Sequence, residues 1–175
     1  MLQLTEAEVL DKIQQLIPFE AQLNDGSLTI RISEYQPYIA TAIHHGHRLR
    51  GDLMPNCLLN EDERYFEEDP FTGDFISSLP IVLQGEDSRY EYDLNRGPDN
   101  CIYEEAWGKP VWSTPLTDAE RAVSLENTTP TTAFWRVWLI HWKAISVCVC
   151  CTICIRTTTS VLNAKYRYST WVLSR

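Results

Sequence analysis

Apolar residues along the first 125 positions recur with the spacing of alternating helices and strands. Residues 5–17 carry them at helical spacing, and Thr5 with Glu8 forms a capping-box pattern at their start. Residues 28–33 alternate apolar side chains with Thr and Arg, which predicts a strand. Residues 38–43 predict a second and more buried strand.

The same patterns predict further elements downstream. They are a helix over 60–67, a turn at 70–73, strands over 80–83 and 90–94, a turn at 95–98 and a helix over 117–125. The last helix again begins with a capping-box pair, Thr117 and Glu120. Because strands and helices alternate, we expect an α/β fold.

The character of the chain changes in its last third. Residues 134–155 hold three of the six tryptophans and four of the six cysteines, and no acidic residue follows Glu126. The stretch is long enough to cross a bilayer, but Arg136, His141 and Lys143 interrupt it, which argues against a membrane span. It also lacks the period of either a helix or a strand.

Composition and charge narrow the class of protein. Hydrophobic residues make up 44% of the 175 positions and charged residues 22%, which is typical of a globular domain. The net charge of -9 argues against a nucleic-acid binder, which usually presents a basic face. Acidic residues near Met1 stand where a signal peptide would be basic and then apolar, so we expect a cytoplasmic protein.

Three segments carry candidate chemistry. His44-His45-Gly46-His47 follows an expected strand, and the carboxyl ends of strands in open α/β sheets are typical ligand sites. A neutral imidazole there could bind zinc, although a surface loop that contains histidines is the alternative. The second segment, Glu67-Glu68-Asp69-Pro70, offers a carboxylate ligand or simply a solvated acidic face.

The third segment runs from Ser88 to Arg96 and places Arg89, Asn95 and Arg96 at the two ends of a short expected strand. Guanidinium groups bind carboxylates in a bidentate way and stabilise oxyanions. The alternative is an edge strand with ordinary salt bridges.

Taken together, these segments resemble the N-formylglutamate amidohydrolase family, which is related to the zinc carboxypeptidases and aspartoacylases. The resemblance rests on a strand ending in His-x-Gly, an acidic pair and the string Ser-Arg-Tyr-x-x-Asp-Leu-Asn-Arg, of which Asp93–Arg96 is the most telling part. Trp112, Pro115-Leu116 and Glu120-Arg121 resemble the next segment of the family. The resemblance covers residues 38–125 and implies a three-layer α/β/α fold with a mixed central sheet.

The resemblance also implies roles for individual residues in the hydrolysis of an N-acyl amino acid. His44 would be the first zinc ligand, and Glu68 or Asp69 the second. Arg89 would polarise the scissile carbonyl, and Asn95 and Arg96 would hold the substrate carboxylate. His45 and His47 depart from the small residues expected there and receive no role.

Two further requirements of the family have no counterpart in the sequence. The third zinc ligand comes from a string like Asp-Met-His-Ser, and a later glutamate activates the zinc-bound water. Neither string occurs, and the surroundings of His141, the remaining histidine, do not match. We therefore expect weak zinc binding and no activity.

The codons of the tail offer an explanation. Read from the third base of each codon, those of residues 151–159 can spell Tyr-Asp-Met-His-Ser-Tyr-Asn-Tyr, which contains the missing ligand string. In the same register residues 145–150 can spell a buried strand, and the threonine runs become Tyr, His and Asn codons. Chance matches among degenerate codons are the alternative. We interpret residues 1–125 as the amino-terminal part of the hydrolase domain and 126–175 as an out-of-frame tail.

Two other hypotheses start from the tail itself. The chain could be a non-enzymatic protein whose tail at 134–155 associates with a membrane. The cysteines could instead bind zinc or an iron–sulfur cluster, but their spacing, C-x-C-C-x-x-C, fits no common pattern. The four residues are Cys148, Cys150, Cys151 and Cys154.

Overall fold

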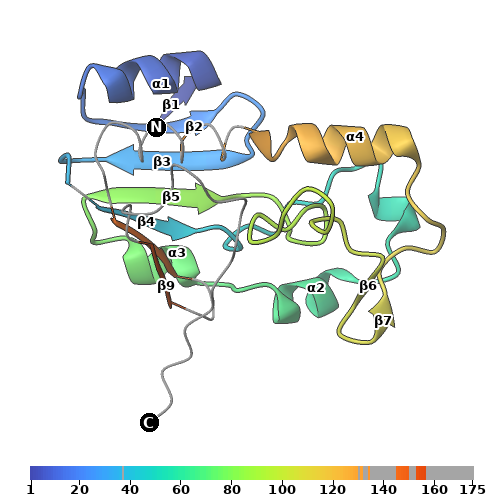
Figure 1. Cartoon of the computed structure of the whole chain (residues 1–175). Helices are drawn as coiled ribbons and strands as arrows, with labels where there is room; N and C mark the ends of the chain where they lie inside the picture. The colour runs from blue at the N-terminus through green and yellow to red at the C-terminus, as the bar shows by residue number, and fades with distance from the viewer. Residues whose placement is uncertain (37, 130, 132–133, 135–144, 150–152, 157–175) are drawn as a thin grey trace, which may run out of the picture.

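The computed structural model describes residues 1–36, 38–129, 131, 134, 145–149 and 153–156, the last two ranges by their backbone. The main sheet contains β1 (Leu2–Leu4), β2 (Phe19–Leu23), β3 (Leu28–Ile32), β4 (Tyr38–Ala42), β5 (Ile81–Gly85), β8 (Ile145–Val149) and β9 (Ile153–Arg156). Their order across the sheet is β1-β2-β3-β5-β4-β8-β9 (Figure 1). The sheet is mixed, because β4 runs parallel to both β5 and β8 while β3 pairs antiparallel with β2 and β5.

Helices lie on both faces of this sheet. The helical elements are α1 (Glu6–Gln14), the 3-10 turn η1 (Met54–Asn56), α2 (Glu61–Glu67), α3 (Thr72–Ile76) and α4 (Asp118–Glu126). The small hairpin of β6 (Glu105–Ala106) and β7 (Lys109–Pro110) completes the described elements. Val9 and Ile13 of α1 pack on one face with Ile30, whereas Ile76 of α3 packs on the other with Val82. The expectation of an α/β fold with a mixed sheet is therefore confirmed.

A second core fills the half of the molecule that lacks long strands. Buried apolar side chains from the segments between β4 and β5 and after β5 come together there, among them Leu53, Tyr90, Val111 and Trp112. The residues of this core come from segments without regular secondary structure. Their packing fixes the loops at the ends of β4 and β5 (Figure 1).

Most predicted elements are confirmed to within a few residues. The capping boxes of Thr5 and Thr117 both form, and each hydroxyl accepts from the backbone N–H three residues later. The helix predicted over 5–17 ends at Gln14, and strands β1 and β2 were not predicted.

One predicted element is wrong and another is only partly confirmed. Residues 90–94 form a turn and loop instead of a strand, because backbone N–H groups there bond to Ser88 and Cys101 carbonyls. The turn expected at 70–73 is replaced from Thr72 onward by α3, and Phe71 before it takes a left-handed conformation.

Only part of the tail falls within the described residues. β8 lies parallel to β4, and β9 pairs back on β8 with Cys148 opposite Cys154. Arg136, His141 and Lys143 lie outside the described residues, as do Cys150 and Cys151. In the part of the chain that the structure describes, no helix is both long and apolar enough to cross a membrane.

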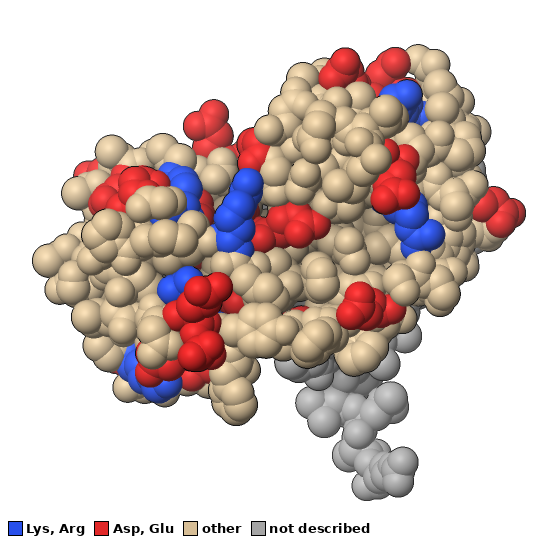
Figure 2. All heavy atoms as spheres, turned by 180° about the vertical axis from the view of Figure 1, so that it is seen from behind, with Lys and Arg blue, Asp and Glu red and all other residues tan. Residues whose placement is uncertain are grey.

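Charged side chains are spread over the surface. On the face shown in Figure 2, acidic groups and basic groups are interspersed, and no continuous basic patch is visible there.

The close approach of two loops explains Gly46 and gives a stability prediction. A Cβ on Gly46 would lie 2.0 Å from the backbone of Glu86, whereas a Cβ on Gly97 would meet open space. Gly46→Ala should lower the free energy of unfolding by about 3 kcal/mol or more, since backbone must move to make room. Urea denaturation followed by circular dichroism measures this, with Gly97→Ala as control. Equal effects of both changes would contradict the described packing.

Candidate functional site

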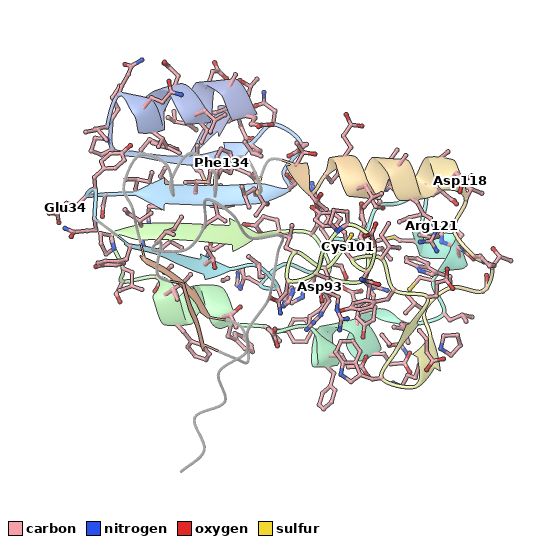
Figure 3. All side chains as sticks on the ribbon, viewed as in Figure 1. Glu34, Asp93, Cys101, Asp118, Arg121 and Phe134 are labelled. Carbon is pink, nitrogen blue, oxygen red and sulfur yellow. The ribbon has the colours of Figure 1, made fainter. Side chains whose placement is uncertain are left out.

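The candidate site lies at the carboxyl ends of β4 and β5. These two strands are parallel neighbours, so the residues that follow them meet at one edge of the sheet. His44 follows β4 by two residues, and Ser88 and Arg89 follow β5 by three and four. Asp93 lies beyond these strand ends, next to the loop core (Figure 3).

Asp93 is the centre of the site and is 1% exposed. Its carboxylate accepts from His44 Nε2 at 2.7 Å, from Arg89 Nη2 at 3.0 Å and from the backbone N–H of Asn95 at 2.7 Å. The Tyr103 hydroxyl also donates to it. Burial alone raises the pKa of Asp93, but these donors lower that pKa well below its usual range. The carboxylate is therefore ionised.

His44 is held between two carboxylates. Its Nδ1 lies 3.1 Å from Asp69 Oδ2, while its Nε2 donates to Asp93. Burial lowers the pKa of His44, yet the hydrogen bonds to the two carboxylates raise it, and the net shift is upward. The bond to Asp93 fixes the ring so that Nδ1 is the nitrogen that faces Asp69.

The acidic pair separates into two roles. Asp69 contacts His44, whereas Glu68, which caps the end of α2, accepts from Ser88 Oγ and lies 2.5 Å from His47 Nδ1. The sequence left both carboxylates open as the partner of His44. The geometry brings Asp69 to His44 and directs Glu68 elsewhere, which also gives His47 a contact that the sequence did not suggest.

The two predicted arginines differ in exposure. The Arg89 side chain is 12% exposed and also lies 3.6 Å from Asp69 Oδ2. The Arg96 side chain is 53% exposed and donates through Nε to the Tyr103 hydroxyl at 3.0 Å. Asn95 is exposed as well. Arg89 is thus part of the buried cluster, while Arg96 and Asn95 are open to a ligand from solvent.

His44 and Asp69 fit two corners of a zinc site. Ligands about 2.1 Å from a tetrahedral zinc ion are separated by about 3.4 Å, close to the observed His44–Asp69 distance of 3.1 Å. Asp93 on the opposite ring nitrogen is the kind of carboxylate that orients a metal-binding histidine. Among the described residues, no group of three or more His, Cys, Asp or Glu side chains is arranged to hold a metal ion. The described residues thus bring one imidazole and one carboxylate together at a spacing that suits two zinc ligands.

Sequence reasoning missed two aromatic residues of the site. Tyr103 donates to Asp93, and the Trp107 ring lies 5.0 Å from the guanidinium carbon of Arg89. Tyr103 comes from the loop before β6, where the sequence shows no motif. Trp107 is followed by Gly108, and that Gly is a turn signal that could have located the tip of the β6–β7 hairpin.

Comparison with known proteins adds no assignment. No family model, curated protein or solved structure matches the chain. The interpretation of the site therefore depends on its geometry and on the motifs described above.

Replacement of the central carboxylate gives a direct test of the site. Asp93→Asn removes the charge that compensates His44 and Arg89 and turns an amide N–H₂ toward their donors. The free energy of unfolding should fall by about 3–5 kcal/mol, the usual cost of breaking a buried ion pair. Asp99→Asn, at an exposed position, is the control for urea denaturation. If the two variants unfold alike, Asp93 does not organise this region.

Proposed function

We propose that residues 1–125 are the amino-terminal part of a zinc-dependent N-formylglutamate amidohydrolase-like hydrolase, and that residues 126–175 are its out-of-frame continuation. One observation carries the proposal: His44 presents Nδ1 to Asp69 while Asp93 holds its other nitrogen, and Arg89 lies against both carboxylates. Helices on both faces of a mixed sheet support the three-layer fold of such hydrolases.

The residues have distinct tasks in this proposal. When bound, zinc would supply an activated water for the hydrolysis of an N-acyl amino acid amide bond. Asp69, rather than Glu68, would share the metal with His44. Arg89 would polarise the scissile carbonyl and stabilise the oxyanion, since its charge is held in place by Asp93.

The substrate carboxylate would bind at the open side of the cluster. Arg96 and Asn95 are the exposed members, and Arg96 is positioned by its hydrogen bond to Tyr103. A guanidinium group that is positioned by one hydrogen bond, on a side chain that is 53% exposed, suits a carboxylate ligand. A small-molecule N-acyl amino acid in the cytoplasm is therefore the proposed substrate of the intact enzyme.

The position of β8 supports the frameshift hypothesis. β8 runs parallel to β4, so its carboxyl end lies at the same edge of the sheet as His44. In the alternative register, residues 145–150 can spell an apolar strand and the histidine string follows it directly. A third ligand encoded there would come from a strand end next to His44, which is where the proposed zinc site lacks one.

Calorimetric titration with zinc tests the proposal. With two protein ligands, the chain should bind zinc with micromolar or weaker affinity and should not hydrolyse N-formylglutamate. His44→Gln and Asp69→Asn should each abolish the binding, whereas His47→Gln, a matched loss of one imidazole, should leave it unchanged. Nanomolar zinc affinity together with hydrolysis by this chain would overturn the proposal.

A gene with one inserted base near codon 126 tests the second part of the proposal, that residues 126–175 are out of frame. The insertion places the tail in the alternative register and restores the histidine string, so the resulting protein should bind zinc with nanomolar affinity. Loss of this affinity on His44→Gln in that protein is the control. A re-framed protein that folds but takes up no zinc would refute the shared ancestry.

A further inference from the structure

Trp107 has a backbone conformation that few tryptophans adopt. Its φ is 50°, and with Gly108 at φ 77° it forms the two-residue turn between β6 and β7. Turns with positive φ at both central residues favour Asn, Asp or Gly at the first position, because a larger side chain is strained there. The hairpin would therefore be more stable with another residue at position 107.

Burial of the indole does not explain this strain. The residue is 57% exposed and lies outside the cores formed by the described residues. The backbone conformation instead places the ring over the site, 5.0 Å from the Arg89 guanidinium carbon and 6.0 Å from the centroids of the Tyr90 and Tyr103 rings. Strain that is maintained at an exposed aromatic residue beside a charged cluster points to a ligand.

We propose that Trp107 determines specificity by stacking on the acyl group of the ligand. The inference rests on the proposed function of the site. In the proposed binding mode the ligand carboxylate lies at Arg96 and the amide carbonyl at Arg89. The acyl substituent on that carbonyl then lies next to the Trp107 ring, which covers Arg89. An indole that lies against a guanidinium group and is still 57% exposed is a platform for a planar apolar group. The preferred ligand class is therefore N-acyl amino acids with an aromatic or similarly flat acyl group.

A pair of ligands that differ only in the acyl group tests this inference by NMR titration of the full chain. N-benzoylglycine should bind at least ten times more tightly than N-formylglycine. Trp107→Asn should remove this preference and raise the melting temperature, since Asn suits the turn, while Trp107→Phe should retain part of the preference. Phe66→Ala, which removes an exposed aromatic ring from α2, should leave the preference unchanged.

The outcomes separate this inference from the proposed function. Equal affinities for the two ligands in the unmodified chain, both weakened by Arg96→Gln, would overturn the role of Trp107 and leave the proposed function intact. The role would also be overturned if Trp107→Asn kept the preference or lowered the melting temperature. Binding of neither ligand, or binding that ignores Arg96→Gln, would instead overturn the proposed function and with it this inference.

Discussion

Much of this structure depends on one buried anion, the carboxylate of Asp93. A charge removed from water is tolerated only where donors surround it, and here they come from separate parts of the chain: His44 after β4, Arg89 after β5 and Tyr103 from the loop core. The Asp93 carboxylate thereby links the sheet half of the molecule to the loop half. The groups that hold the fold together at this point are also the groups that would perform the chemistry.

The sequence predicts those parts of the fold where local chemistry and tertiary packing agree. Both capping boxes form as expected, and β3 alternates between buried and partly exposed side chains. The prediction failed at residues 90–94, whose alternating pattern indicates a strand. There long-range hydrogen bonds outweigh the local pattern. Asp93 points inward to His44 and Arg89, and a regular strand in the sheet would not bring its side chain to them.

The sequence predicted several residues of the candidate site but not the contacts between them. Motifs singled out His44, Arg89 and Arg96, because their side chains have chemistry that a sequence displays. They could not distinguish Glu68 from Asp69. Both are carboxylates, and the end of α2 at Glu68 decides which side chain points toward His44. Tyr103 and Trp107 were missed for a related reason: aromatic residues are common in cores, and their role at the site arises from a loop and a strained turn.

The pairing of β8 with β4 has a consequence for the fate of such a chain. Sheet pairing joins backbone N–H and C=O groups, which every reading frame encodes equally, so a segment with foreign side chains can still dock on a waiting edge. Such docking shields β4 from pairing with other molecules, a common start of aggregation. Under the proposed frameshift, backbone complementarity alone would cover β4, and the edge of the sheet would move outward to β9.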